Sequence, residues 1–290
     1  MAHPAAARYG VIGHPVGHSL SPRIHSAFAL QTGEPLSYEA LEAPLDGFLA
    51  CAGDFIQHGG RGLNVTLPFK RAAFEFATRH SPRATRAGAV NTLGFDSEGI
   101  WGDNTDGVGL TRDLARLAEE GRPTLCGARV MMIGAGGAAQ GVLGPLIDLE
   151  PAELILVNRN LARARSLCEQ FSGGATLLSA RSLESLRDGP LPEVDVVIHA
   201  TSLSLAGASP DVPDALLARA RLVYDLSYAP GPADASTAFL RHARRAGSTH
   251  TCDGLGMLVE QAAESFFVWR GVLPDTAPVL QQLRSALAKH

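Results

Sequence analysis

A glycine-rich turn between an apolar strand and a helix most restricts the fold of this chain. Residues 130–133 form a short apolar run, and Gly134, Ala135, Gly136, Gly137, Ala138 and Ala139 follow it directly in the form G-x-G-x-x-A. Glycines at these positions let the backbone turn tightly and approach a pyrophosphate, whose charge the N-terminus of the next helix stabilises. The segment therefore predicts a dinucleotide site on a strand–turn–helix unit.

Three more apolar runs follow, at residues 154–157, 194–198 and 222–224, and helical segments separate them. Each run is hydrophobic on both faces, as expected for parallel strands that helices cover on both sides. We therefore expect the second part of the chain to form a Rossmann-type domain with a parallel sheet.

The first part of the chain also alternates short apolar runs with amphipathic stretches, which is typical of an α/β protein. We expect a first helix with Ser21 as its N-cap, Pro22 at its first helical position and Gly33 at its end. Gly121-Arg122-Pro123 is expected to stop a later helix near a junction between two lobes. The predicted strands lie at residues 9–12 and 61–66, and the other predicted helices at 46–58, 69–79, 108–120, 140–149, 258–270 and 277–289.

The composition excludes several classes of protein. With 25 basic and 29 acidic side chains among 290 residues, the formal charge of −4 argues against nucleic-acid or anionic-membrane partners. The first ten residues lack the pattern of a signal peptide, and no apolar stretch is long enough for a membrane span. Four well-separated cysteines predict buried, reduced thiols and a cytoplasmic location, and no metal site is expected.

The strand after the glycine turn indicates which dinucleotide binds. It ends in Asn158-Arg159 and lacks the Asp or Glu that usually accepts a hydrogen bond from the ribose of NAD. A guanidinium can instead bind a 2′-phosphate with two hydrogen bonds. We therefore expect NADP(H). Arg163 is a second candidate ligand for the phosphate, with a solvated helix face as the alternative.

Polar residues gather at element ends in the first part of the chain. Asn64, Thr66 and Lys70 run from a strand end into a helix start. A lysine at a helix start is unfavourable for the helix dipole, which makes Lys70 a candidate functional residue. The alternative is that Lys70 is an ordinary exposed lysine. Asp106 precedes a helix, so it is either a site residue or an N-cap. The hydroxyls of Ser19 and Ser21 at a helix start suit a substrate carboxylate.

Several segments together resemble the shikimate dehydrogenase family, and they follow the family's order over nearly the whole chain. They are Gly13-His14-Pro15 with Ser19-Leu20-Ser21-Pro22, Asn64-Val65-Thr66-Leu67-Pro68-Phe69-Lys70, Ala87-Gly88-Ala89-Val90-Asn91-Thr92, Asn104-Thr105-Asp106-Gly107, the glycine turn, Asn158-Arg159, and Gly254-Leu255-Gly256-Met257-Leu258-Val259-Glu260-Gln261.

The resemblance implies a two-lobed α/β enzyme that reversibly reduces the small molecule 3-dehydroshikimate to shikimate with NADPH, a step toward aromatic amino acids. Residues 1–107 with 253–290 would form the substrate-binding domain, and residues 108–252 the Rossmann NADP-binding domain. Lys70 and Asp106 would be the catalytic pair. Ser19, Ser21 and Tyr228 would bind the carboxylate, and Asn64, Thr66, Asn91 and Gln261 the ring hydroxyls. Thr201, Gly254 and Met257 would lie at the cofactor, with Met257 near the nicotinamide.

The chain departs from the family's usual pattern at three positions. His199 replaces an asparagine beside the cofactor, Ser26 replaces the asparagine after His25, and Asn160 takes the place of a common threonine. Three other functions are possible for such a sequence. They are an NAD-using quinate/shikimate dehydrogenase, an enzyme for an amino-substituted shikimate, and a non-catalytic NADP-binding sensor. A sensor need not retain Lys70 with Asp106. A monomer or a homodimer is expected.

Overall fold

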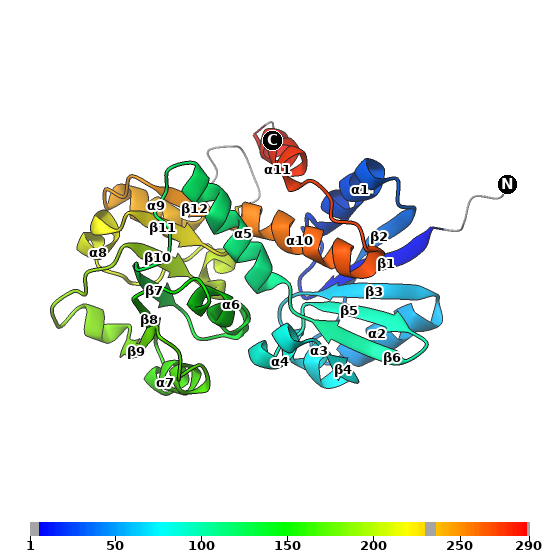
Figure 1. The fold of residues 1–290 in the computed structure, drawn as a ribbon, viewed down its shortest axis with the longest axis horizontal. Helices are drawn as coiled ribbons and strands as arrows, with labels where there is room; N and C mark the ends of the chain where they lie inside the picture. The colour runs from blue at the N-terminus through cyan, green and yellow to red at the C-terminus, as the bar shows by residue number, and fades with distance from the viewer. Residues whose placement is uncertain (1–5, 230–235, 289–290) are drawn as a thin grey trace. The chain divides into compact units, whose positions relative to one another are not determined.

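The structure, a computed structural model, describes residues 6–229 and 236–288 and consists of two compact units (Figure 1). The first unit comprises Met1–Gly109 and Leu258–Arg284, and the second comprises Leu110–Met257 and Ser285–His290. Each unit is built on its own six-stranded sheet. The predicted α/β class is therefore confirmed. Gly121-Arg122-Pro123 lies within the second unit.

The sheet of the first unit has the order β2-β1-β3-β5-β6-β4. β1 pairs in parallel with β2 and β3, whereas β5 pairs antiparallel with β3 and β6. The strands are β1 (Ala7–Gly13), β2 (Leu36–Glu42), β3 (Gly60–Val65), β4 (Arg79–His80), β5 (Thr92–Asp96) and β6 (Gly99–Asp103). The helices that belong wholly or mainly to this unit are α1 (Ser21–Thr32), α2 (Phe48–Gln57), α3 (Lys70–Phe76), α4 (Pro82–Ala87), α10 (Leu255–Arg270) and α11 (Thr276–Leu287).

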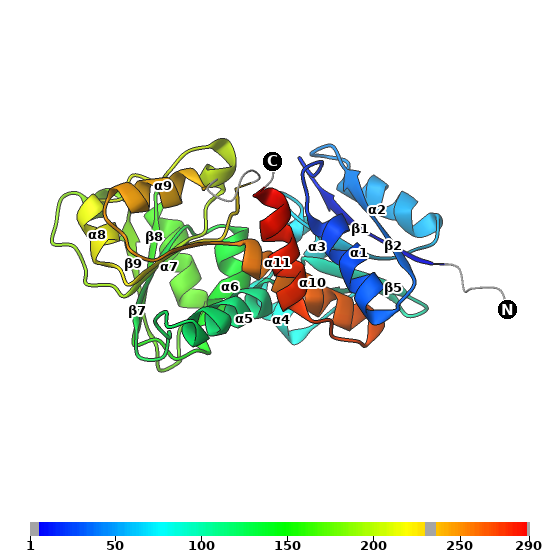
Figure 2. The ribbon, with the colours of Figure 1, turned by 90° about the horizontal axis from the view of Figure 1, so that it is seen from above.

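Strand alternation sorts the side chains of this sheet between two layers of helices. Leu63 and Val65 of β3 pack in a buried cluster with residues of α2, α3 and α4. Asn64, between them in sequence, points to the other face, where it meets α10. There α1 and α10 lie side by side, with the rings of His25 and Phe266 6.3 Å apart (Figures 1 and 2). A polar side chain is thereby buried between the sheet and α10, where Ser265 is its partner.

The sheet of the second unit is parallel throughout, with the order β12-β11-β10-β7-β8-β9. Its strands are β7 (Arg129–Ile133), β8 (Glu153–Asn158), β9 (Leu177–Ser182), β10 (Val196–His199), β11 (Leu222–Asp225) and β12 (Thr251–Asp253). Its helices are α5 (Asp106–Glu119), which begins in the first unit, α6 (Gly137–Ile147), α7 (Leu161–Gln170), α8 (Asp214–Arg219) and α9 (Ala238–Arg245).

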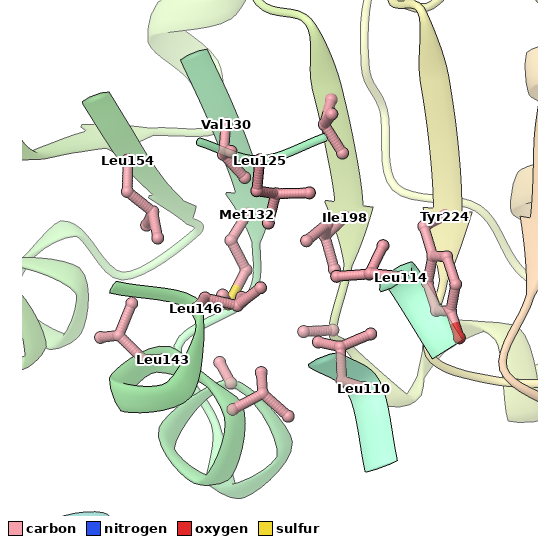
Figure 3. Packing of buried hydrophobic residues seen from close by; sticks show 14 of the residues in the cluster. Leu110, Leu114, Leu125, Val130, Met132, Leu143, Leu146, Leu154, Ile198 and Tyr224 are labelled. Carbon is pink, nitrogen blue, oxygen red and sulfur yellow. The ribbon is translucent and has the colours of Figure 1, made fainter. Parts of the chain in front are cut away.

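Both faces of this second sheet are buried, which explains its continuous apolar runs. Met132 and Ile198 pack with α5 and α6 on one face (Figure 3). Their neighbours Met131 and Val197 pack with α8 and α9 on the other. The prediction of parallel strands covered on both sides is confirmed.

Local features differ from the predictions at two places. α1 begins at Ser21 with Leu20 at its N-cap position, and the hydroxyl of Ser19 accepts a hydrogen bond from the Ser21 N–H at 3.2 Å. The prediction that Ser21 caps the helix is therefore wrong, because Ser21 is already inside it. The prediction that the cysteines are buried is also wrong: Cys126 is exposed, and Cys51, Cys168 and Cys252 are half-buried, although all four are free as predicted.

Gly33 ends α1 in the left-handed conformation at φ 72°, as predicted. Among the helices of residues 6–229 and 236–288, none is long and apolar enough to cross a membrane.

Candidate functional site

An ion pair between Lys70 and Asp106 is the centre of the polar cluster in the first unit. Lys70 is the first residue of α3 and Asp106 the first residue of α5, so two helix starts supply the pair. The side chain of Lys70 is 17 % exposed and that of Asp106 is 7 % exposed. The positive end of the α5 dipole stabilises the Asp106 carboxylate. The α3 dipole disfavours the Lys70 ammonium, which the ion pair with Asp106 stabilises instead. The pair is thus shielded from solvent without being sealed from it.

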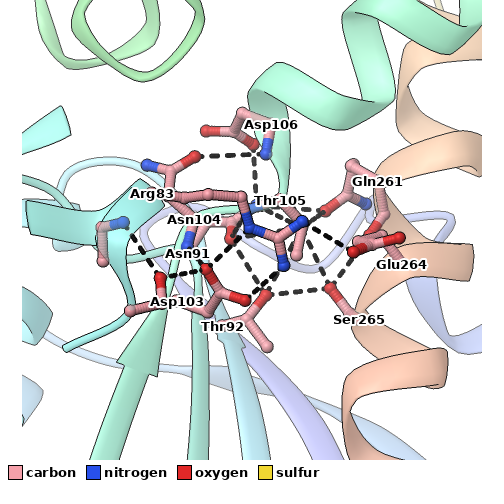
Figure 4. A network of polar contacts seen from close by, with 12 residues as sticks. Arg83, Asn91, Thr92, Asp103, Asn104, Thr105, Asp106, Gln261, Glu264 and Ser265 are labelled. Carbon is pink, nitrogen blue, oxygen red and sulfur yellow. Dashed lines mark hydrogen bonds and ion pairs between the residues drawn. The ribbon is translucent and has the colours of Figure 1, made fainter. Parts of the chain in front are cut away.

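Asn91 fixes the orientation of the Asp106 carboxylate. Its side-chain amide donates to Asp106 Oδ1 at 2.8 Å and to Thr105 Oγ1 at 3.0 Å, while its oxygen accepts from the Thr105 N–H at 2.8 Å. The amide also faces Gln261 Oε1 of α10 at 3.3 Å (Figure 4). Since Asn91 is 2 % exposed, this arrangement holds one carboxylate oxygen and leaves the other to Lys70.

A second part of the network surrounds Asn64. Tyr38 donates to Asn64 Oδ1 at 2.7 Å, and the Asn64 amide donates to Ser265 Oγ at 2.9 Å and Thr92 Oγ1 at 3.1 Å. Burial raises the pKa of Tyr38 well above its ordinary value, against a smaller opposing hydrogen bond from Ser21. Tyr38 therefore stays a neutral donor. Asn64, Asn91 and Gln261 belong to one connected set with the catalytic candidates.

Arg83 anchors the segment that leads to Asp106. Its guanidinium donates to Asp103 Oδ2 at 2.5 Å and to Glu264 Oε1 at 2.6 Å (Figure 4). Burial lowers the pKa of Arg83, but the hydrogen bonds to both carboxylates outweigh it and the pKa is raised. The pKa of Asp103 is lowered, since the bonds from Arg83 and Ser81 outweigh the effect of burial. These charges tie α4 and α10 to the end of β6.

The remaining substrate candidates lie at different places. Ser19 and Ser21 are at the start of α1, and Thr66 follows β3, half-buried, with its methyl group against Gly13. Tyr228 belongs to the second unit, in the segment after β11. The contacts described above thus join Asn64, Asn91 and Gln261 to Lys70 and Asp106, and they link Ser21 through Tyr38.

The glycine turn of the second unit joins β7 to α6. Gly134 has φ +124°, and a Cβ there would lie 2.8 Å from the carbonyl oxygen of Ala200. At Gly136 and Gly137 a Cβ would meet no atom within 4 Å, and no side chain caps the helix at Gly136. Open space in front of uncapped helix N–H groups fits a pyrophosphate. The residues present therefore fit a dinucleotide.

Asn158 and Arg159 end β8 beside this turn, whose Gly134 N–H donates to Val157 O at 2.7 Å. Arg159 and Arg163 are exposed, and neither pairs with a carboxylate of the described residues. Asn160 is the N-cap of α7 and accepts from the Ala162 N–H at 3.0 Å. Since Asn and Thr both cap helices, this departure from the family pattern preserves the helix start.

The other cofactor candidates are packed residues. Thr201 Cγ2 lies 3.0 Å from the position that a Gly134 Cβ would take, so it lines the turn. A Cβ at Gly254 would lie 2.1 Å from Leu226 O, so only glycine fits there. Met257 is 9 % exposed and packs in the cluster of α5 and α6.

Family models match most of the chain. Residues 11–93 match the shikimate dehydrogenase substrate binding domain, residues 116–228 match shikimate / quinate 5-dehydrogenase, and residues 254–284 match the shikimate 5′-dehydrogenase C-terminal domain. The chain belongs to the shikimate dehydrogenase family.

Curated relatives and solved structures are similar to this chain over nearly its full length. A shikimate dehydrogenase (NADP(+)) of Methylobacillus flagellatus is 51 % identical over 96 % of this chain and 99 % of its own. The crystal structure of an Ael1 enzyme from Pseudomonas putida is 42 % identical, with a TM-score of 0.85 over 96 % of this chain and 98 % of its own. Shikimate 5-dehydrogenase from Thermus thermophilus, solved with NADP(H) and shikimate, is 35 % identical, with a TM-score of 0.80 over 97 % of this chain and 100 % of its own.

The sequence analysis did not identify Tyr38, Arg83 and Ser265, which also belong to the hydrogen-bond network around Lys70 and Asp106. Ser265 lies four residues after Gln261 on α10, a spacing that places both on one helix face and could have suggested it. Tyr38 and Arg83 carry no comparable signal, because their partners are distant in sequence.

Proposed function

We propose that this protein catalyses the reversible reduction of 3-dehydroshikimate to shikimate with NADPH. The observation that carries the proposal is the Lys70–Asp106 ion pair, held by Asn91 inside a chain of this family. A binding protein without catalysis would have no need to keep an ammonium and a carboxylate together in a largely buried position. This argument disfavours the sensor alternative.

The proposed roles follow from the charge that develops on the substrate. Bound NADPH supplies the hydride that goes to the carbonyl carbon. Negative charge then grows on the carbonyl oxygen and needs a cation or proton donor within about 3 Å. Lys70 Nζ would meet that charge, and Asp106, its ion-pair partner, would orient it. In the reverse direction the same pair accepts the proton of the shikimate hydroxyl.

The other residues are proposed to bind and orient. Asn64, Thr66, Asn91 and Gln261 would contact ring hydroxyls, and Ser19, Ser21 and Tyr228 would contact the carboxylate. Gly134, Ala135, Gly136, Gly137, Ala138 and Ala139, with Asn158, Arg159, Arg163, Thr201, Gly254 and Met257, would hold NADPH. Residues 1–107 with 253–290 would thus be the substrate domain and residues 108–252 the cofactor domain. We also propose that the protein acts in the cytoplasm, which its free cysteines support. As an oligomeric state we propose a monomer or a homodimer.

A direct assay tests the reaction. The purified protein is mixed with shikimate or quinate and either NADP⁺ or NAD⁺, and formation of reduced nicotinamide is followed by absorbance. We expect turnover with shikimate and NADP⁺ to exceed every other combination. Preference for quinate with NAD⁺ would contradict the proposal, and so would absence of turnover.

Arg159→Ala is expected to raise the Kd for NADPH by about 10- to 100-fold and to change the Kd for NADH far less. The reason is the loss of charge-assisted hydrogen bonds to the 2′-phosphate, each worth about 1.5–3 kcal/mol. Titration of each cofactor by fluorescence measures both constants. Arg165→Ala, which removes an exposed arginine of α7 near Arg159 in sequence, is the matched control. Equal weakening of both cofactors would refute the phosphate contact.

Gly136→Val is expected to leave the free energy of unfolding within about 0.5 kcal/mol of wild type. Its backbone, at φ −98° and ψ −170°, suits any residue, and a Cβ there meets no atom within 4 Å. It should raise the Kd for NADPH by at least about tenfold, or 1.4 kcal/mol, because it fills the proposed pyrophosphate position. Gly134→Ala should instead destabilise the fold through its positive φ and the Ala200 oxygen. Unchanged NADPH affinity in Gly136→Val would move the cofactor away from this turn.

A further inference from the structure

Three strand ends of the second unit lie in one row at the carboxyl edge of the sheet. His199 of β10 is paired in register with Ile133 of β7, the residue before the glycine turn, and with Asp225 of β11. Both His199 and Asp225 are 0 % exposed. They project to the face that α9 covers, where the His199 ring lies 4.7 Å from that of Phe239. A titratable pair is thus buried directly beside the proposed cofactor turn.

The hydrogen bonds around this pair define the tautomer of His199. Asp225 Oδ2 accepts from Ser204 and Thr237, each at 2.6 Å, and Oδ1 accepts from the Ser227 N–H at 3.0 Å. A carboxylate that only accepts requires His199 Nδ1, at 3.1 Å, to carry a proton. In the neutral ring, Nε2 is then an acceptor, and the Thr201 hydroxyl at 2.6 Å donates to it.

This bond determines how Thr201 faces the turn. With its hydroxyl committed to His199, Thr201 directs its methyl group at Gly134, and its oxygen accepts from the Leu203 N–H at 3.3 Å. Thr201 is therefore held in one rotamer at the first glycine of the motif. Without His199, the hydroxyl could rotate toward the turn and the methyl group away from it.

We infer that His199, oriented by Asp225, is a positioning residue that holds Thr201 in the rotamer that the cofactor requires. The inference rests on the proposed function, since it assigns NADPH to the glycine turn. His199 acts through Thr201 and does not itself touch the reacting atoms.

Asparagine reproduces this chemistry. A neutral histidine offers one N–H donor and one acceptor on opposite sides, and an asparagine side chain offers an N–H donor and an oxygen acceptor. Either can donate to Asp225 and accept from Thr201. The histidine at this position therefore preserves the polarity of the asparagine that the family usually carries, and leucine does not.

The experiment measures NADPH binding without substrate, and then kcat and KM with shikimate and NADP⁺. His199→Leu should raise the Kd for NADPH and the KM for NADP⁺ by about 5- to 10-fold, with kcat at saturating cofactor within about twofold. His199→Asn should restore the affinity to within about twofold of wild type. Ser248→Ala removes a buried hydrogen bond to Leu217 O, 2.8 Å long, that lies outside the His199 network of the same unit, so it should lower Tm and leave NADPH affinity unchanged.

A double-variant comparison tests the route through Thr201. In a Thr201→Val background, adding His199→Leu should not weaken NADPH further. Full additivity would overturn the inference, as would wild-type affinity in His199→Leu or a loss confined to kcat. If the wild-type protein itself failed to bind NADPH, the proposed function would fall together with the inference. Normal wild-type binding with an unaffected His199→Leu would overturn the inference alone.

Discussion

Lys70→Ala is expected to lower kcat by about 10²- to 10⁴-fold with little change in the KM for shikimate. The ammonium interacts most strongly with the charge that develops on the carbonyl oxygen, so its loss affects the transition state more than the bound substrate. Steady-state assays with shikimate and NADP⁺ measure both constants. The largely buried ion pair with Asp106 makes the effect specific to this lysine.

Its neighbour on α3 provides the control. Arg71 forms an exposed pair with Glu75 at 3.2 Å, and its side chain is 88 % exposed. Arg71→Ala should therefore leave kcat within about twofold, since exposed pairs contribute little. A loss below tenfold in Lys70→Ala would remove Lys70 from the catalytic role.

Acidification is expected to destabilise the protein through His25, which is buried on α1. Burial lowers the pKa of His25 from 6.5 to about 3, against a smaller opposing effect of the Asn64 side chain. The unfolded chain takes up this proton below about pH 6.5 and the folded chain only near pH 3. The stabilising contribution is therefore complete above pH 6.5 and is lost as the pH falls. Between pH 6.5 and 4.5 the loss is about 2 kcal/mol.

His25→Phe isolates this contribution. The ring of His25 stacks on Tyr38 at 4.1 Å and lies near Phe266, so phenylalanine suits the site without titrating. Urea unfolding of both proteins from pH 7.5 to 4.5 gives the difference in unfolding free energy. This difference should shift by about 2 kcal/mol in favour of the variant on acidification. A difference that did not vary with pH would contradict the assignment.

Features encoded by consecutive residues were predictable from the sequence. The glycine turn, the four apolar strands of the second sheet and the glycine at the end of α1 each depend on residues within one element and its flanks. The pairing of Lys70 with Asp106 was reached through the family resemblance, because no local pattern connects the starts of two helices. The residue roles inferred from that resemblance remain predictions.

Features that depend on tertiary packing were not predictable. Asn64 reaches Ser265 only because the late helix α10 packs on a sheet formed by early strands. His199 was noticed as a departure from the family pattern, but its partner Asp225 is set by strand register. The prediction that Ser21 caps α1 was wrong because a serine before a proline can occupy either the N-cap or the first helical position.

The division of the first unit between two distant stretches of chain has a consequence during protein synthesis. Residues 110–254 must be translated after the early strands emerge and before α10 can form. At about 5–20 residues per second this takes on the order of ten seconds. Throughout that interval the nascent sheet lacks the helix that supplies Ser265 and Phe266, so Asn64 and His25 are without these partners. The first part of the protein to leave the ribosome is therefore among the last to finish folding.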